Sequence, residues 1–233
     1  MTQPFAARSN SQSVNVYLKF SPDNNALKLI KDFNRYLGKN KIFSHYRLTP
    51  FLVAHPLHLT LYLTNYNPKH LPQISQRIQR IAKQTKPIIV KTGKIEISSS
   101  RYTMLSISNS KPLQALSNKV VIQLMAFRDQ RTPIPSWVKN NAAKRLSFLR
   151  FGSPNVFANF SPHFSIFAAD HLTSKDAKKL QEALTPLLNQ FNSKKSALDA
   201  QAIAIGIGLA DAQGQIMQEL YAFPLAGLNT FTA

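Results

Sequence analysis

Two short segments of the chain share one arrangement of histidine, hydroxyl and apolar residues. The first begins at His58 and continues Leu-Thr-Leu-Tyr-Leu, and the second begins at His163 and continues Phe-Ser-Ile-Phe-Ala. Because strand side chains alternate between two faces, His58 and Thr60 would point one way, and His163 and Ser165 would do the same on a second strand. Two imidazoles and two hydroxyls can surround a phosphate and move protons on both sides of it.

The spacing alone is a weak signal, because a third histidine also precedes a hydroxyl residue by two positions. His171 is followed by Leu172 and Thr173, but no apolar strand continues, and Thr173 is better explained as the cap of a following helix. The other two histidines lie in apolar alternating runs, one in each half of the chain, closely after Pro56 and Pro162. Strand context and placement therefore favour these two copies.

The chemistry that suits this pair is general acid–base catalysis at a phosphodiester. A histidine pKa near 6.5 lets one imidazole be neutral and the other protonated at neutral pH, so no metal or other cofactor is needed. The hydroxyls of Thr60 and Ser165 can donate to the non-bridging oxygens, where charge builds in the transition state. Arg47 and Arg150, which precede the two motifs, are the candidate basic contacts.

Aromatic residues near the motifs have two interpretations. Tyr62 and Phe167 are the next same-face positions and would wall the cleft and stack on a base, unless they are core aromatics. Trp137, the one tryptophan, lies in a segment at about 128–152 that carries six Lys or Arg and one acid, Asp129. It would hold RNA by stacking and charge, or else anchor an amphipathic helix.

Other chemistries have less support in the sequence. Metal ligation by His55 and His58 lacks a carboxylate cluster, since the chain has only 10 Asp and Glu. No G-x-S-x-G nucleophile elbow and no P-loop occur. Gly206 and Gly208 lie in a strand-like run that no helix follows, which makes a poor dinucleotide-binding loop.

The composition limits the partners. The chain has 29 Lys and Arg against 10 Asp and Glu, a formal charge of +19. This charge favours a polyanionic partner such as RNA, DNA, a nucleotide or an anionic membrane, although a basic proteome would also explain it. The absence of cysteine excludes disulfides, thiol catalysis and Cys-ligated metals. No apolar run approaches the roughly 18 residues that span a bilayer. We expect a cytoplasmic monomer, although an exported mature chain whose signal was removed would fit as well.

The elements that must position the motifs alternate between strand and helix patterns. Predicted strands cover 14–20, 58–64, 87–91, 94–98, 102–108, 163–169, 199–209 and 216–223, and predicted helices cover 26–37, 68–84, 112–127, 136–150 and 173–191. Residues 39–57 read as a basic loop, and Gly93 reads as a turn between two strands.

This order predicts an α+β fold. We expect one domain over 14–225, built of two pseudo-symmetric lobes of antiparallel sheet with flanking helices around a central cleft. Each lobe would contribute one histidine strand, and the basic segment at about 128–152 would be an insertion. Residues 1–13 would form a flexible lead-in, and 226–233 a tail.

With these motifs the sequence resembles the 2H phosphoesterase superfamily, which includes the bacterial RNA 2′,3′-cyclic phosphodiesterases, also called 2′-5′ RNA ligases. The signature of that family is two copies of His-x-Thr/Ser-x, matched here by Leu57–Leu61 and Ser161–Ile166. The sequence departs from it in having Ser165 for the commoner threonine, in lacking a basic residue after the second motif, and in the long gap between motifs.

The resemblance implies metal-independent hydrolysis of 2′,3′-cyclic phosphates or 2′-5′ linkages in RNA ends or nucleotides. One histidine would activate water and the other would protonate the ribose O3′, and we assign His163 as base and His58 as acid. Three alternatives remain open: an RNA- or nucleotide-binding module without turnover, a nuclease that trims RNA 3′ ends, and a phosphodiesterase for cyclic oligonucleotides. The intact motifs favour an enzyme over the binding module.

Overall fold

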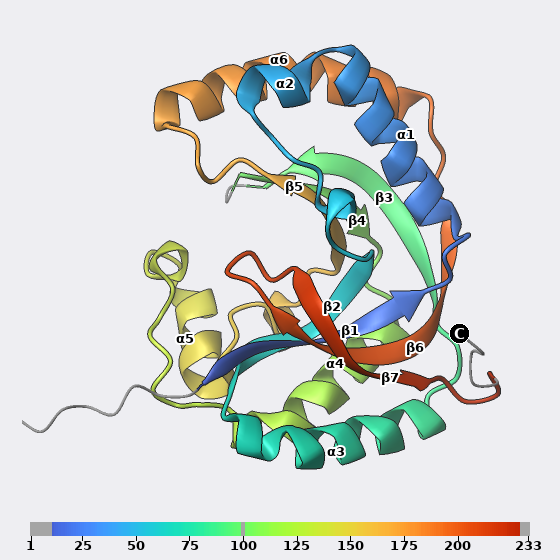
Figure 1. Cartoon of the computed structure of the whole chain (residues 1–233), viewed down its shortest axis with the longest axis vertical. Helices are drawn as coiled ribbons and strands as arrows, with labels where there is room; N and C mark the ends of the chain where they lie inside the picture. Colours follow the sequence, from blue (N-terminus) through green and yellow to red (C-terminus); the bar gives the residue numbers. More distant parts are fainter. Residues whose placement is uncertain (1–10, 99–100, 229–233) are drawn as a thin grey trace, which may run out of the picture.

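The computed structural model describes residues 11–98 and 101–228, so most of the predicted lead-in and residues 229–233 of the predicted tail lie outside it. Its helices and antiparallel sheet confirm the α+β class (Figure 1). The division into two pseudo-symmetric lobes remains a prediction. No helix in the described ranges is long and apolar enough to cross a membrane.

Seven strands form the sheet, and every paired neighbour is antiparallel. They are β1 (Gln12–Phe20), β2 (His58–Tyr66), β3 (Ile89–Ile97), β4 (Tyr102–Ile107), β5 (His163–Ala168), β6 (Asp199–Ala210) and β7 (Ile216–Pro224). The hydrogen-bonded order is β2-β1-β6-β3-β4-β5, with β7 also paired to β6. Strand β6 joins the sheet together, because its start pairs with β3 and its remainder pairs with β1 and β7.

The helices cover the sheet on opposite sides of the molecule. They are α1 (Asn25–Lys39), α2 (Ile42–Tyr46), α3 (Leu71–Gln84), α4 (Lys111–Leu124), α5 (Ala142–Phe151) and α6 (Ser174–Ser193). Short 3-10 turns are η1 (Phe51–Val53), η2 (Pro68–His70), η3 (Met125–Phe127), η4 (Ser136–Val138) and η5 (Phe157–Asn159). In Figure 1, α1 and α6 lie at the top, where α1 contacts β6 and α6 contacts β3, whereas α3 and α4 lie below β7 and β2.

Short polar side chains begin the main helices, as their sequence predicts. The Asn24 side chain accepts the Leu27 N–H at 2.8 Å at the start of α1. The Thr173 hydroxyl accepts the Asp176 N–H at 3.2 Å at the start of α6. Each cap satisfies one backbone donor that the first helical turn leaves free.

Two local predictions are wrong. Gly93 is not a turn but an interior residue of one continuous strand, β3, at an irregularity in its pairing with β4. A Cβ at Gly93 would lie 2.5 Å from the Ser106 hydroxyl, so the close approach of the neighbouring strand requires glycine. The helix predicted over 136–150 begins at Ala142 instead, because Asn141 caps it by accepting the Lys144 N–H at 3.0 Å.

The sheet curves until its two outermost strands approach one another. Strands β2 and β5 are the opposite ends of the hydrogen-bonded order, yet they come within 8 Å between Cα atoms. Phe20 of β1 and Phe164 of β5 close the interior between them, with ring centroids 5.0 Å apart. Both strands that carry a histidine motif therefore meet across the interior without forming a ladder.

Gly206 and Gly208, which the sequence does not explain, make room for a ring on β6. A Cβ at Gly206 would fall on the Tyr17 ring, and one at Gly208 would lie 3.5 Å from it. Tyr17 is buried, donates a hydrogen bond to the Glu219 carboxylate at 2.7 Å, and packs edge-on against His58 at 5.6 Å between centroids. These glycines therefore serve the packing beneath the first motif.

Replacing Gly206 with alanine should destabilise the fold, because the added methyl group must displace a buried ring. We expect Gly206→Ala to lower the free energy of unfolding by about 1–3 kcal/mol, measured by urea denaturation. The matched control is Gly38→Ala in α1, where a Cβ would meet nothing within 4 Å. Alanine there should be neutral or stabilising by up to about 1 kcal/mol. Equal losses in the two variants would contradict the proposed packing.

Candidate active site

The hydroxyl residue of the first motif is followed by an extra residue in the strand. Adjacent residues Val16 and Tyr17 of β1 pair with Tyr62 and Thr60 of β2, so Leu61 has no partner of its own. A one-residue bulge reverses the side-chain alternation beyond it. His58 and Thr60 share one face, and Leu61 and Tyr62 are both buried after the reversal.

The second motif has the same irregularity at the same place. Adjacent residues Thr103 and Met104 of β4 pair with Phe167 and Ser165 of β5, so Ile166 is the extra residue. As on β2, the residues on both sides of the reversal are buried. Both motif strands thus present histidine and hydroxyl on one face and then change face at the fourth motif position.

These bulges correct the prediction that Tyr62 and Phe167 wall the site. Both side chains are buried, because each follows the bulge and points away from the face of the histidine. The Tyr62 hydroxyl donates to the Phe151 carbonyl at the end of α5. Phe167 packs edge-on against Phe43 of α2, with 5.5 Å between centroids. The alternative interpretation, that both are core aromatics, describes them correctly.

The two imidazoles are held in the same way. Nδ1 of His58 lies 3.0 Å from the Pro56 carbonyl oxygen, and Nδ1 of His163 lies 2.8 Å from the Ser161 carbonyl oxygen. A carbonyl only accepts, so each Nδ1 carries a proton and donates it. Each ring is therefore fixed by a backbone group two residues upstream, and Nε2 is the nitrogen available for proton transfer.

Burial controls the titration of both rings. It lowers the pKa of His58 below 6.5, against the opposing effect of the Pro56 carbonyl, and the neighbouring His163 lowers the pKa of His58 further. Burial also lowers the pKa of His163, where the Glu96 carboxylate raises it and the Lys144 ammonium lowers it. The electrostatic effect of His163 on His58 is the direct sign that the two motifs share one environment.

The Thr60 hydroxyl is oriented by an amide that the sequence analysis missed. Asn15 of β1 is fully buried, and its Nδ2 donates to the Thr60 hydroxyl at 2.8 Å and to the Gly214 carbonyl at 3.0 Å. Because the hydroxyl oxygen accepts from Asn15, its own hydrogen remains available to another acceptor. A lone asparagine in an apolar strand was the signal, since a buried amide needs partners.

The turn between β6 and β7 connects the surroundings of the two motifs. Its Gly214 carbonyl receives Asn15, beneath the first motif. Its Gln213 side chain donates to both carboxylate oxygens of Asp170, just beyond β5, at 3.0 and 2.9 Å. His55 contacts the same hairpin through the Ile216 carbonyl at 3.0 Å. Side chains of this hairpin therefore bridge the two strand ends where the sheet itself does not.

The candidate basic residues lie in different surroundings from those expected. Arg47 and Arg150 are exposed, and neither forms a hydrogen bond with a motif residue in the described part of the chain. The cation that acts on His163 is Lys144 of α5. Its Nζ lies 5.5 Å from the centroid of the Trp137 ring, and Trp137 is 52% exposed. Arg47 and Arg150 remain predictions as substrate contacts, as does Trp137.

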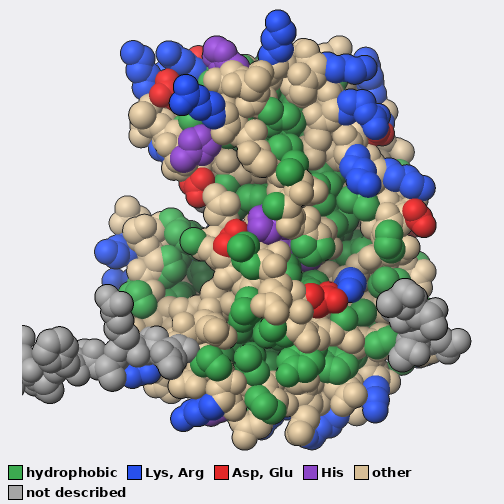
Figure 2. Space-filling model, in the orientation of Figure 1, with side chains coloured by type: hydrophobic (Ala, Val, Ile, Leu, Met, Phe, Trp, Pro, Cys, Tyr) green, Lys and Arg blue, Asp and Glu red, His purple; other side chains and the backbone are tan. Residues whose placement is uncertain are grey.

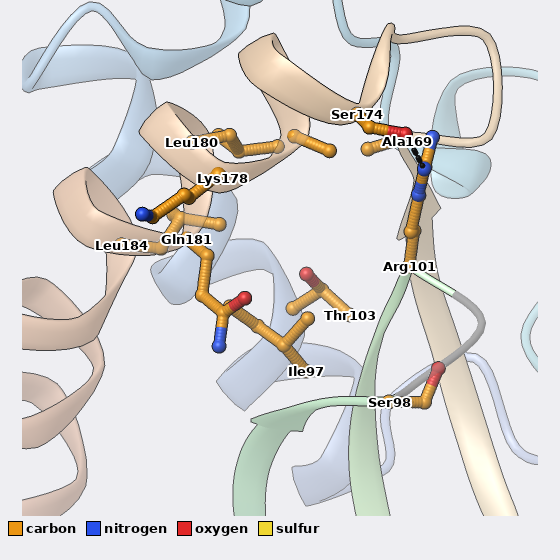
Figure 3. A pocket seen from close by; sticks show the side chains of 11 residues that line it. Ile97, Ser98, Arg101, Thr103, Ala169, Ser174, Lys178, Leu180, Gln181 and Leu184 are labelled. Atoms are coloured by element: carbon orange, nitrogen blue, oxygen red, sulfur yellow. Dashed lines mark hydrogen bonds between the residues drawn. The ribbon is translucent and has the colours of Figure 1, made fainter.

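A separate pocket lies between the β3–β4 hairpin and the start of α6 (Figure 3). It has a volume of about 310 Å³ and contains neither motif. Arg101 projects beside it, donating to the Leu172 carbonyl at 2.7 Å and the Ser174 hydroxyl at 3.2 Å. Arg101 therefore secures the start of α6. Within residues 11–98 and 101–228, no three His, Asp or Glu side chains gather in a group able to hold a metal ion.

Comparisons with known proteins agree on the family. A model of the 2′-5′ RNA ligase superfamily matches residues 40–202, more than half of the chain and both motifs. No curated protein matches the chain. Among solved structures, TT0787 of Thermus thermophilus is 14% identical, with a TM-score of 0.51, and the match covers 93% of this chain and all of that one.

Two further structures match at 12% identity and a TM-score of 0.49. For E. coli LigT in its apo form, the match covers 93% of this chain and 98% of that one. For Kluyveromyces marxianus Usb1, it covers 93% and 99%. Members of the matched superfamily are phosphodiesterases that act on RNA or nucleotides. From the family match and its paired motifs, this chain belongs to the 2′-5′ RNA ligase superfamily of 2H phosphoesterases.

Proposed function

We propose that this protein is a metal-independent phosphodiesterase that hydrolyses 2′,3′-cyclic phosphates or 2′-5′ linkages in RNA ends or nucleotides. One observation supports it above all: two imidazoles, each held through Nδ1 by a carbonyl two residues upstream, share one environment. This leaves two equivalent Nε2 atoms, one for each proton that hydrolysis must move.

The reaction on a cyclic phosphate uses one histidine on each side of phosphorus. Nε2 of His163, as general base, takes a proton from water as the water oxygen bonds to phosphorus. Nε2 of His58, as general acid, gives its proton to the ribose O3′ as the P–O3′ bond breaks. The product is a 2′-phosphate, and the two histidines have exchanged protonation states. Solvent exchange then restores the pair.

The hydroxyls would stabilise the charge that builds on the non-bridging oxygens. Thr60 is suited to this because Asn15 occupies its oxygen as an acceptor and leaves its hydrogen for the phosphate. Ser165 occupies the equivalent position on β5 and would donate from the opposite strand. Neutral imidazoles also suit an anionic substrate, whose charge would raise the pKa of the histidine that must be protonated.

The deciding experiment is hydrolysis of the four nucleoside 2′,3′-cyclic phosphates in excess EDTA. We expect turnover to persist in EDTA and kcat to fall at least about 100-fold in both His58→Ala and His163→Ala, because each removes one proton-transfer group. His171→Ala is the matched control and should retain full activity, since His171 is exposed and beyond β5. Binding of nucleotide without any turnover would instead favour the binding-module alternative.

The pH dependence should reflect the buried histidines. Activity requires one imidazole protonated and one neutral, so kcat/KM is greatest between the two pKa values of the free enzyme. Because burial lowers both, we expect the maximum of kcat/KM below pH 6.5, with a decline as pH rises and the general acid loses its proton. Lys144→Gln should move one limb to higher pH, since Lys144 lowers the pKa of His163, whereas Lys139→Gln should not. A maximum above pH 7.5 would contradict this interpretation.

Asn15 should affect catalysis through Thr60. We expect Asn15→Ala to lower kcat about tenfold, the equivalent of one hydrogen bond of about 1.4 kcal/mol, with a smaller effect on KM. In a Thr60→Ala background the same change should cost little further activity, because the hydroxyl it orients is gone. Full additivity of the two changes in kcat would show that Asn15 does not act through Thr60. Thermal unfolding of each variant separates this effect from lost stability.

A further inference from the structure

The α5 segment, residues 136–152, is anchored to the approaches of both motifs. At its C-terminal end, the Tyr62 and Thr64 hydroxyls of β2 donate to two backbone carbonyls, Thr64 at 2.8 Å. Within α5, the Ser147 hydroxyl accepts from the Asn159 side chain at 2.8 Å, and Asn159 lies four residues before His163. The segment is thus fixed against both strands that carry the catalytic histidines.

Its outer surface combines an exposed aromatic ring with exposed aliphatic side chains. Trp137 is 52% exposed, Leu146 49% and Leu149 53%. Near them is a surface hollow of about 480 Å³, lined by Lys139, Asn140, Ala142, Arg145, Leu146 and Leu149. Figure 2 shows a depression with apolar walls between the α5 region and the elements above it. Exposed apolar groups of this kind, rimmed by cations, mark a binding surface.

The charge of this surface has one sign. The only acid in the 128–152 segment, Asp129, is engaged by Arg131 at 3.2 Å. Among the described residues, no carboxylate lies within 4.0 Å of the side-chain nitrogens of Lys139, Lys144 or Arg145. Lys144 lies over the face of Trp137, and its charge also reaches His163. Cations therefore extend from the catalytic pair to the exposed ring.

We propose that the α5 segment binds the single-stranded RNA that flanks the scissile phosphate, with Trp137 stacking on a base and Lys139, Lys144 and Arg145 contacting phosphates. An aromatic platform beside a line of cations is how proteins hold single strands without reading their sequence. This inference rests on the proposed function and narrows it: the preferred substrates are oligonucleotides rather than mononucleotides.

Binding is testable without turnover, because Trp137 is the only tryptophan of the chain and its fluorescence reports on this surface alone. The probe is a single-stranded RNA of about eight nucleotides, titrated into His58→Ala protein. We expect saturable quenching that weakens with added salt. Inorganic polyphosphate, which has charge but no bases, should compete without comparable quenching. No quenching by RNA, or equal quenching by polyphosphate, would overturn base stacking at Trp137.

Kinetics provide the second test. We expect Trp137→Ala to raise KM about tenfold for an oligonucleotide that ends in a 2′,3′-cyclic phosphate, since stacking contributes about 1–3 kcal/mol per base. Hydrolysis of a nucleoside 2′,3′-cyclic phosphate should be unchanged, and Trp137→Phe should restore most of the loss. The control is Tyr221→Ala, which removes another exposed ring, on β7.

The outcomes separate the two proposals. Turnover that shows no dependence on Trp137 for either substrate overturns the α5 surface and leaves the phosphodiesterase intact. Quenching by RNA without turnover of any cyclic or 2′-5′ substrate supports the surface and overturns the enzyme.

Discussion

The site depends on two strand edges that approach each other without pairing. Strands β2 and β5 end the hydrogen-bonded order, and curvature of the sheet brings them within 8 Å between Cα atoms. Backbone pairing between them would fill the space that a phosphate needs, whereas wider separation would leave each histidine alone. Their spacing is maintained by packing, as between Phe20 and Phe164, and by the Gln213–Asp170 bridge. An unpaired edge, usually a liability, is here what makes a site between two halves of one sheet.

The chemistry follows from how that space is built. Backbone carbonyls two residues upstream fix both imidazoles, so ring orientation does not depend on distant side chains. Burial then lowers both pKa values, which keeps the free site nearly neutral in a chain of formal charge +19. The surrounding cations attract a polyanion, while the histidines themselves become charged only as an anionic substrate arrives. Attraction and proton transfer are thus assigned to different residues.

Much of this was predictable, and the failures have physical causes. Periodicity and caps located the strands and helices, and motif context selected His58 and His163 over His171, because both signals are local. The faces of Tyr62 and Phe167 were mispredicted because a bulge is set by the neighbouring strand, which the motif itself does not reveal. Asn15 and Lys144 went unrecognised because their roles exist only through contacts with residues far along the chain. The role of Gly206 likewise depends on a ring from another strand.

The paired bulges also explain why the recurring unit in this chain is four residues long. In an uninterrupted strand, every second side chain beyond the histidine would continue to face the phosphate, and selection for catalysis would extend along the strand. The extra residue at Leu61 and at Ile166 ends that exposure. Beyond it, Tyr62 and Thr64 are free to hold α5, and Phe167 to pack against α2. Each strand is therefore divided between two tasks, and its scaffold half can diverge while its catalytic half stays short and constant.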